Sequence, residues 1–337
     1  MTKLTDLNEV VLKPIKATTI EKIRKAGILT VQDLAIQMPR ELAEKTGMGV
    51  DTAVNAIDKA LSLSRSGLIS GSDLRKEQDK RTRLSTGVTE FDKLLTTKKE
   101  WDEKQRGGVL SETVLEIIGE KGTGKTQICF RLAIQAQLPL EAGGLDGEVI
   151  WIDTEGTFFA SRIIEICEAS GFDPEEVLSK IWVGSAVTTQ DQKRLVEETS
   201  AVCHEKNIKL IIVDSMMGHM RSEYVGRGML ADRQGELKQI LHNLKHLCWI
   251  HKITGVYTNQ VQDDPGKMYG DPLKPIGGHI MGHSPTYRVQ LRRGRGPLRI
   301  VSMKKSADLP DGEARFKVTE RGIEDVEKKK GDEEDVE

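Results

Sequence analysis

The sequence lacks the features of a secreted or membrane-bound protein. It contains no run of about 18 apolar residues, the length that a transmembrane helix needs. Its start, MTKLTDLNEV, lacks the apolar stretch of a secretory signal. We therefore expect a protein that stays inside the cell, in the cytoplasm, and has no membrane partner.

Cysteine is scarce and scattered. The four cysteines include no CxxC pair and stand at Cys129, Cys167, Cys203 and Cys248. Disulfide frameworks and cysteine-based zinc sites need clustered cysteines. We therefore expect reduced thiols in the core.

Neither sign of charge dominates. Lys and Arg number 50 against 52 Asp and Glu, and the formal net charge of −2 does not by itself point to a nucleic-acid partner. The distribution is more informative, because five arginines crowd into one short segment: Arg288, Arg292, Arg293, Arg295 and Arg299. The end of the chain, residues 326–337, is nearly all charged and is expected to be a disordered tail.

The chain divides by pattern into further segments. Its 337 residues exceed one ordinary core, so two domains are expected. Residues 1–64 have the periodicity of short helices, with Thr30 as an N-cap, and predict a small all-α domain. Residues 65–83 are polar, with Gly and Ser, as in a linker. From 84 to 325, strand-like runs alternate with helical stretches, which predicts an α/β domain with a mostly parallel sheet and a final meander.

A Gly-Met-Gly turn at residues 47–49 separates two of the N-terminal helices. The backbone N–H groups of such a turn can hold a DNA phosphate at the start of the second helix. An ordinary corner between helices has the same local sequence, so this segment alone leaves both interpretations open.

The strongest motif is GEKGTGKT, which fits the P-loop pattern G-x-x-x-x-G-K-[ST] between a strand-like and a helical segment. Its glycines let the backbone wrap phosphates with N–H groups inward, at the positive end of a helix dipole. We expect Lys125 to reach the β- and γ-phosphates of ATP and Thr126 to bind Mg²⁺. The predicted cradle comprises Gly119, Glu120, Lys121, Gly122, Thr123, Gly124, Lys125, Thr126 and Gln127.

Carboxylates follow two other strand-like runs. KLIIVD ends in Asp214, a position suited to holding Mg²⁺. After EVIWI, both Asp153 and Glu155 fit as the base that deprotonates water. His279 and His283 have the spacing of a metal pair, but the sequence offers no apparent third ligand.

Taken together, these blocks resemble the RecA/RadA recombinase family, closest to its archaeal RadA type. The resemblance spans about residues 5–325 and includes GEKGTGKTQIC, IDTEGTF, LIIVDS, SEYVGRGMLADRQ, YTNQV, KPIGGHIMGH, RRGRG and LPDGEA. It implies a helix–hairpin–helix domain followed by a P-loop RecA-type ATPase core that uses ATP and Mg²⁺. It also implies a filament or ring of identical subunits and DNA-dependent ATPase activity. Strand exchange between single- and double-stranded DNA would then serve recombinational repair at an archaeal nucleoid, with recombination mediators as further partners.

The resemblance assigns roles residue by residue. Glu155 matches the family's catalytic glutamate, which favours it over Asp153. Arg162 matches the arginine that packs on the adenine, while Gln260 and His283 match two γ-phosphate sensors.

The family binds DNA through two loops, which match RSEYVGRGMLADR and residues 262–278. Positive side chains would hold phosphates there, and Met or Tyr would wedge or stack against bases. Solvated loops with incidental charges are the alternative. The candidate DNA-binding residues are Arg221, Tyr224, Arg227, Arg233, Lys267, Met268, Tyr269 and Lys274, with Gly47 and Gly49 in the N-terminal domain.

The chain departs from the family pattern at several positions. Leu68 and Gly71 stand where the family has a Phe and a small residue that anchor one subunit to the next. Phe-Ala-Ser at 159–161 replaces Arg-Pro-Glu, and residues 97–108 form an insertion with no assigned role.

One further departure lies in the cap over the neighbouring subunit's ATP. Pro310 matches the proline of that cap, and Lys305 replaces an Asp that helps to hold a monovalent cation. The Lys305 ammonium is expected to take the cation's place, although an exposed lysine on a turn would look the same in sequence.

Two other functions compete with the recombinase. A non-catalytic mediator would also bind ATP and DNA, but such relatives often lack the N-terminal domain or the second DNA loop. A hexameric helicase would share the core, but the N-terminal hairpin and the anchor-like linker disfavour it.

Overall fold

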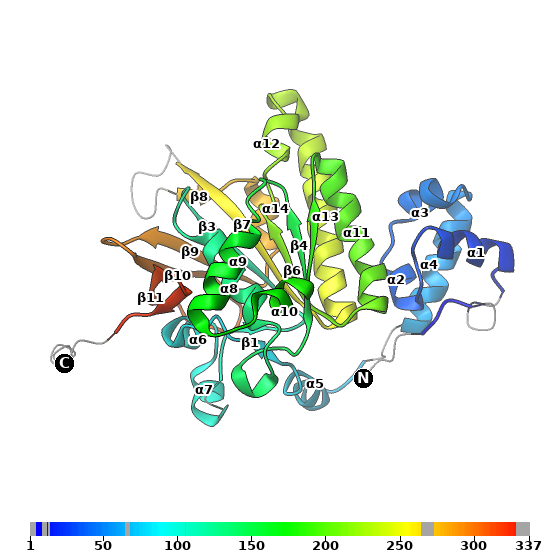
Figure 1. Cartoon of the computed structure of the whole chain (residues 1–337). Coiled ribbons are helices and arrows are strands. Elements are labelled where there is room, and N and C mark those ends of the chain that lie inside the picture. The colour runs from blue at the N-terminus through cyan, green and yellow to red at the C-terminus, as the bar shows by residue number, and fades with distance from the viewer. Residues whose placement is uncertain are drawn as a thin grey trace.

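The computed structural model describes residues 5–8, 12, 14–64, 68–104, 106–263 and 273–327. They form a small helical body near the N-terminus and a larger α/β body (Figure 1). This confirms the predicted fold class. The predicted charged tail lies almost wholly outside the described residues.

The helical body contains α1 (Ala17–Lys25), α2 (Val31–Ala35), α3 (Pro39–Thr46) and α4 (Val50–Ser64). Thr30 is the N-cap of α2, as predicted, and forms a capping box with Asp33. Gly47 ends α3 with a φ of +64°, a left-handed conformation that favours glycine. The helices enclose their own apolar core, in which Leu34 and Leu42 are fully buried.

The predicted linker, residues 65–83, contains a helix that the sequence analysis did not anticipate. This helix, α5 (Gly71–Gln78), has no buried residue. It begins because the Ser70 hydroxyl accepts a hydrogen bond from Asp73 N at 3.1 Å. Leu68, the anchor candidate, lies just before this helix and is 108% exposed. No part of its own chain therefore shields its side chain from solvent.

The insertion at 97–108 also contains a helix, α7 (Lys98–Lys104). Glu100 in this helix receives two hydrogen bonds, at 2.9 and 2.7 Å, from the guanidinium of Arg83. Arg83 lies on β1 (Arg83–Leu84), which pairs with β2 (Val109–Leu110) in a separate two-stranded sheet. The insertion is therefore packed onto the core by a forked ion pair.

A ten-stranded sheet forms the centre of the α/β body. Its strands are β3 (Val114–Gly119), β4 (Glu148–Asp153), β5 (Ile181–Ser185), β6 (Ile208–Asp214), β7 (Thr254–Asp263), β8 (Leu273–Pro275), β9 (Tyr287–Arg293), β10 (Leu298–Lys305), β11 (Glu313–Thr319) and β12 (Gly322–Asp325). The order is β12-β11-β10-β9-β3-β7-β6-β4-β5, with β8 paired to β7. The strands from β9 to β5 are parallel, and β10 to β12 form the predicted antiparallel meander.

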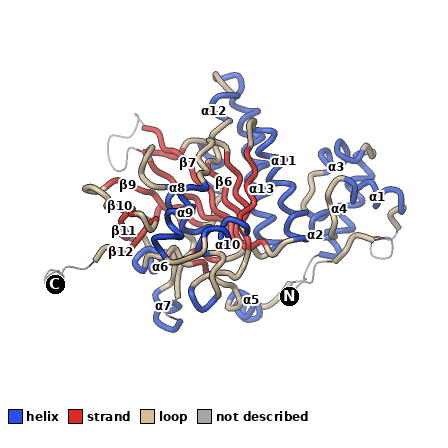
Figure 2. The backbone as a smooth tube through the Cα atoms, in the orientation of Figure 1, coloured by secondary structure: helices blue, strands red, loops and turns tan. Residues whose placement is uncertain are grey.

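Helices cover both faces of this sheet (Figure 2). One face carries α6 (Thr89–Leu94), α8 (Lys125–Gln135), α9 (Ala160–Ser170) and α10 (Pro174–Ser179); the other carries α11 (Thr189–Glu205), α13 (Leu230–His251) and α14 (Gly278–His283). Successive strand residues point to opposite faces, so Trp151 joins the first core cluster and Ile150 the second. Burial on both sides explains the continuous apolar runs in the sequence. Among the described helices, none has both the length and the apolarity that a membrane crossing requires.

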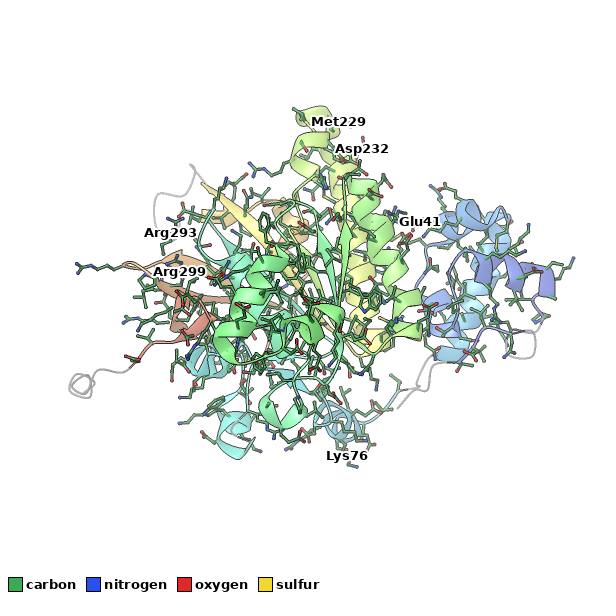
Figure 3. The ribbon with its side chains drawn as sticks, viewed as in Figure 1. Glu41, Lys76, Met229, Asp232, Arg293 and Arg299 are labelled. Carbon is green, nitrogen blue, oxygen red and sulfur yellow. The ribbon has the colours of Figure 1, made fainter. Side chains whose placement is uncertain are left out.

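The helical body docks on α11 and α13 (Figure 1). Lys45 Nζ lies 2.5 Å from Glu197 Oε2, and Lys193 Nζ lies 3.6 Å from Glu41 Oε1, which is labelled in Figure 3. The contact therefore joins residues about 150 positions apart in the chain through charged pairs.

Candidate functional site: nucleotide cradle and DNA loops

The P-loop connects the end of β3 to the start of α8, as the motif requires. Gly122 and Gly124 have φ values of +76° and +102°. The positive φ favours glycine at Gly122, whereas an added Cβ would meet only the flexible end of Arg293, which can shift. The first turn of α8 consequently directs its backbone N–H groups and its positive dipole end toward the loop.

Thr126 and Asp214 come together across the start of α8 and the end of β6. Thr126 Oγ1 donates to Asp214 Oδ2 at 2.7 Å, and Thr258 donates to the other carboxylate oxygen. Burial raises the pKa of Asp214 above its usual value, and the two hydroxyl hydrogen bonds only partly oppose this. Hydroxyl and carboxylate oxygens are the hard ligands that Mg²⁺ prefers, so this donor set fits the metal.

Lys125 lies over the loop itself. Its Nζ donates to the carbonyl oxygens of Gly119 at 2.8 Å and Glu120 at 3.0 Å. Burial lowers the pKa of Lys125, while the charges of Asp214 and Glu155 act in the opposite direction. The ammonium is therefore held at the centre of the predicted phosphate site.

The two carboxylates after β4 occupy different environments. Asp153 accepts hydrogen bonds from the backbone N–H groups of Glu155 and Thr157, both at 3.1 Å, and of Phe158 at 3.0 Å. Its oxygens are thus used in stabilising the turn. Glu155 instead accepts from the Ser215 hydroxyl and, at 3.4 Å, from Gln260 Nε2. This difference supports Glu155 rather than Asp153 as the base.

Glu155 faces a small polar cavity of about 120 Å³. Its lining residues are Thr154, Glu155, Ser215, Met217, Gly218, Arg221 and Gln260. Arg221 lies on α12 (Met220–Glu223), and its Nη1 donates to Gln260 Oε1 at 2.8 Å. Sequence reasoning assigned Arg221 to DNA, but the structure places its guanidinium on the proposed γ-phosphate sensor.

A larger open cavity, of about 640 Å³, lies on the other side of the P-loop helix. Arg162 lines it, and its Nε donates to Gln127 Oε1 at 2.9 Å. A second guanidinium nitrogen of Arg162 donates to the carbonyl oxygen of Thr319 at 2.5 Å. Phe159 also lines this cavity and is 59% exposed, so an aromatic ring stands beside the proposed adenine site.

The structure describes the predicted DNA residues only in part. Tyr224 is half-buried against the second core cluster, which favours a packing role. Arg233 is half-buried on α13, and its Nε has no hydrogen-bond partner among the described residues. Lys274 is exposed on β8, where it pairs with Gln262 of β7. Lys267, Met268 and Tyr269 lie outside the described residues, as do the side chains of Arg227 and His283.

The other predicted residues lie apart from this site. Gly47 and Gly49 stand in the turn between α3 and α4, where an added Cβ would meet open space or only ordinary contact. Pro310 follows β10, at the end of which Lys305 Nζ donates to the carbonyl oxygen of Pro285 at 2.8 Å. Burial lowers the pKa of Lys305, and the neighbouring Arg288 and Lys245 lower it further.

Two arginines hold the P-loop from the C-terminal meander, a role that the sequence analysis missed. Arg293 Nε donates to the carbonyl oxygen of Gly122 at 3.1 Å, and Arg299 Nε donates to that of Thr123 at 3.1 Å. Both arginines are labelled in Figure 3. The crowding of arginines in the sequence was the available signal, but it could not show which of them point to the loop.

A buried ion pair lies behind the site and was also missed. Glu116 on β3 pairs with Arg288 on β9, and Asn259 Nδ2 donates to Glu116 Oε1 at 3.1 Å. Asn259 Nδ2 also donates to the carbonyl oxygen of Ile276 at 2.8 Å. Through Asn259, the pair thus fixes the position of β7 just before Gln260. It also fixes the position of Ile276, near the end of the second loop.

The comparisons with known proteins agree with this geometry. The family model described as Rad51 matches residues 78–326. The chain is 37% identical over 316 residues to the DNA repair and recombination protein RadA of Aeropyrum pernix. That alignment covers 94% of this chain and 96% of the relative. Because the family model covers most of the chain and the relative is 37% identical over 94% of it, the chain belongs to the Rad51 family.

Proposed function

We propose that this chain is an ATP-dependent DNA strand-exchange recombinase that acts in homologous recombination and DNA repair. One observation carries the proposal: Gln260 lies between Glu155 of the nucleotide site and Arg221 of the first DNA loop. Gln260 also lies on β7, the strand that leads into the second loop. A change at the γ-phosphate position would therefore alter both DNA loops through the side chain of Gln260.

Each residue of the nucleotide site has a separate role in ATP hydrolysis. Thr126 and Asp214 would hold Mg²⁺, which neutralises charge on the phosphates when bound. Lys125 and the backbone of the cradle bind and orient the phosphates. Glu155 orients a water in the 120 Å³ cavity and takes its proton at the carboxylate. Arg162 would pack on the adenine, with Phe159 beside it.

Assembly would use surfaces that the single chain leaves exposed. Leu68 is wholly exposed, and β5, an edge strand, has Trp182 and Val183 exposed by 40% and 43%. An edge strand offers unpaired backbone groups to another chain. These features support an anchor in which Leu68 and Gly71 of one copy bind to a neighbouring copy. Pro310 and Lys305 of one copy would complete the ATP site of the copy beside it.

DNA would contact both bodies. Residues 1–64 act as a helix–hairpin–helix domain whose turn at Gly47 and Gly49 holds a backbone phosphate. Residues 84–325 form the ATPase core, in which Lys274 and the two loops hold the strands. Base pairing, rather than the protein, would then read homology.

The test is ATP-dependent strand exchange between a labelled single strand and homologous duplex DNA. Wild-type protein should form joint molecules only with ATP and Mg²⁺. Lys125→Ala should abolish them, whereas Lys180→Ala, at an exposed lysine paired with Glu176, should not. Retained ATP and DNA binding without joint molecules in the wild type would refute the proposal and favour a mediator. Rings rather than filaments in electron micrographs would favour a helicase.

A further inference from the structure

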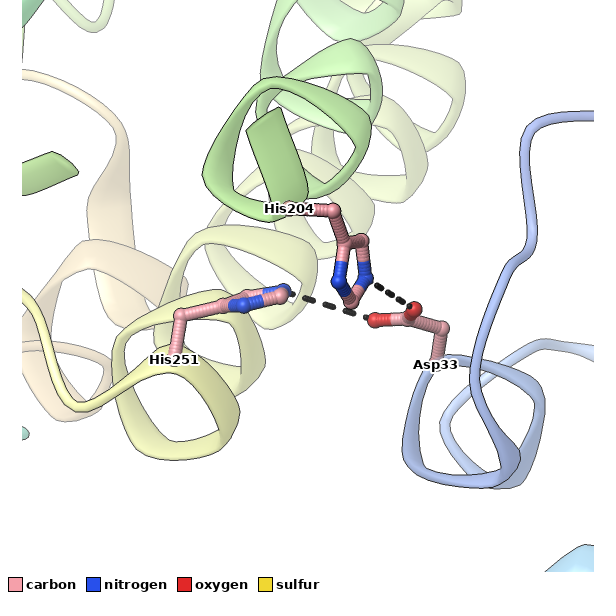
Figure 4. A group of neighbouring side chains, drawn as sticks. All are labelled: Asp33, His204 and His251. Atoms are coloured by element: carbon pink, nitrogen blue, oxygen red, sulfur yellow. Dashed lines mark hydrogen bonds and ion pairs between the residues drawn. The ribbon is translucent and has the colours of Figure 1, made fainter. Parts of the chain in front are cut away.

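Three potential metal ligands meet where the helical body docks on the core (Figure 4). Asp33 comes from α2, His204 from the last turn of α11, and His251 from the end of α13. One ligand atom of each lies within 4.8 Å of the others. Within the described part of the chain, this is the one group of three or more such residues that close together.

The three side chains are withdrawn from solvent. The exposed fractions are 4% for Asp33, 2% for His251 and 18% for His204. A buried carboxylate needs compensation, because removing its charge from water is unfavourable. Burial alone would raise the pKa of Asp33, but hydrogen bonds from His204, His251, Ser200 and Thr30 outweigh it and hold the pKa well below its usual value.

The surroundings favour a cation at this point. Both α11 and α13 end here, and the C-terminal end of each helix carries the negative pole of its dipole. A buried carboxylate and two helix C-termini with two imidazoles therefore form a site of negative potential lined by nitrogen and oxygen donors.

The ligand atoms lie close enough together for one small ion. His204 Nε2 lies 3.0 Å from Asp33 Oδ2, and His251 Nε2 lies 3.4 Å from Asp33 Oδ1. Ligand atoms bound to Zn²⁺ at about 2.0–2.1 Å in a tetrahedron are about 3.3 Å apart. The two imidazoles contact different oxygens of the same carboxylate, and one ligand atom of each of the three residues lies within 4.8 Å of the others, so one ion could be reached by all three after side-chain rotation.

The carboxylate already has the supporting hydrogen bonds of a metal ligand. The Thr30 hydroxyl donates to Asp33 Oδ2 at 2.7 Å, and the Ser200 hydroxyl donates to Asp33 Oδ1 at 2.7 Å. Ligating carboxylates are usually held by such outer partners, which fix their orientation. Ser200 Oγ also lies 2.9 Å from His251 Nε2, so it reaches two of the three ligands.

An access route leads to the group. A cavity of about 220 Å³ lies between the helical body and the core, and Asp33 and Ser200 line it together with Lys45 and Glu197. It opens onto the Asp33 and Ser200 side of the group, whereas neither imidazole lines it. Three protein ligands plus water is a common coordination for Zn²⁺.

We propose that Asp33, His204 and His251 bind one Zn²⁺ ion that clamps the N-terminal domain onto the ATPase core. The ion would link α2 of one body to α11 and α13 of the other. Because the ligands come from both bodies, zinc binding would favour the docked arrangement over one in which the DNA-binding hairpin separates from the core. Zinc would thus set the position of the hairpin relative to the DNA loops.

Cobalt is a suitable probe, because tetrahedral Co²⁺ absorbs visible light strongly. The full-length untagged protein is treated with chelator, dialysed into buffer with excess Mg²⁺ to occupy the Thr126–Asp214 site, and titrated with Co²⁺ and then Zn²⁺. We expect tetrahedral bands that saturate at one equivalent and disappear when Zn²⁺ displaces the cobalt. Zn²⁺ should also raise the melting temperature of the wild type.

The chain provides a matched control. His242 and His246 also lie on α13, with ring centroids 4.2 Å apart, but no third ligand joins them among the described residues. His204→Gln and His251→Gln should each weaken Zn²⁺ binding by more than about 100-fold, and Ser200→Ala by about 10-fold, as for an outer partner. The double variant H242Q/H246Q should bind as the wild type does. Circular dichroism checks that each variant folds.

Three results would overturn the proposal. These are the absence of tetrahedral bands in the wild type, persistence of the bands in both single variants, and loss of the bands only in H242Q/H246Q. If docking of the helical body depends on pH but not on Zn²⁺, the cluster is a proton-linked histidine–aspartate contact instead. The two proposals are tested separately, because the cobalt titration measures metal binding, whereas joint molecules that require ATP and Lys125 measure strand exchange.

Discussion

The buried ion pair between Glu116 and Arg288 gives the sharpest test of how the site is supported. Glu116 has no exposed side-chain surface and Arg288 has 10% exposed. Arg288→Met retains much of the side chain's apolar length but removes the guanidinium. The variant keeps the Asn259 amide at 3.1 Å from Glu116 but leaves no cation paired with it among the described residues. It also removes the donor to the carbonyl oxygen of Met281.

Breaking such a buried pair on one side costs about 3–5 kcal/mol, because the remaining charge stays out of water. Burial already raises the pKa of Glu116, and losing Arg288 removes the main influence that lowers it. The pKa of Glu116 should therefore rise further in the variant. A carboxyl whose pKa is raised in the folded state makes the protein less stable as pH rises through that pKa. The loss of unfolding free energy in Arg288→Met should therefore become smaller as pH is lowered.

Urea unfolding, followed by tryptophan fluorescence, measures this effect. With an m value of about 3 kcal/mol/M, the midpoint should fall by roughly 1–1.7 M. The double variant E116Q/R288M removes the charge but keeps an acceptor for Asn259, so it should be more stable than Arg288→Met by about 2 kcal/mol. A loss below about 1 kcal/mol in the single variant, or no recovery in the double, would refute the reasoning.

Three further predictions concern catalysis, nucleotide binding and pH, and a fourth concerns the cation. Glu155→Gln should lower DNA-stimulated phosphate release by about 10²–10⁴-fold with little change in ATP affinity; unchanged turnover would remove Glu155 as the base. Gly122→Ala should weaken binding of a fluorescent ATP analogue by at least about tenfold, because φ is +76° and the new Cβ meets Arg293; equal affinity would contradict this. Burial raises the pKa of Asp92 to about 6, so its contribution to stability is full below about pH 4 and is lost as pH rises through about 6. Relative to Asp92→Asn, the wild type should lose about 3 kcal/mol of unfolding free energy between pH 4 and 7, and parallel curves would disprove the assignment. If Lys305 replaces a monovalent cation, ATPase rates in sodium and potassium buffers should be equal, and a strong potassium requirement would exclude it.

The sequence determined the parts of this protein that depend on local pattern. The P-loop requires glycines and a lysine within one short segment, and its conformation follows from the covalent geometry of those residues. Apolar runs such as those of β4 and β6 predicted buried parallel strands, because each run must be covered on both faces. The capping box at Thr30 is equally local, since its partner is three residues away. The family resemblance added roles to residues that these patterns had already located.

Two helices escaped prediction because their sequences carry little apolar periodicity. The helix α5 buries none of its residues, and α7 is held largely by the ion pair from Glu100 to Arg83. Neither feature produces the 3.6-residue apolar repeat on which the sequence analysis relied. Composition predicted a linker and the family pattern predicted an insertion, but neither predicted the helices within them.

Only the tertiary structure decided which polar residues meet. Asp33 is separated from His204 by 171 residues, and Glu116 from Arg288 by 172. It also showed that Arg221 donates to Gln260, and that Asp153 and Glu155 accept hydrogen bonds from different partners. Local patterns report the direction of a side chain along its own strand or helix. Which distant group shares its buried space depends on how whole elements pack, and that is fixed by the fold.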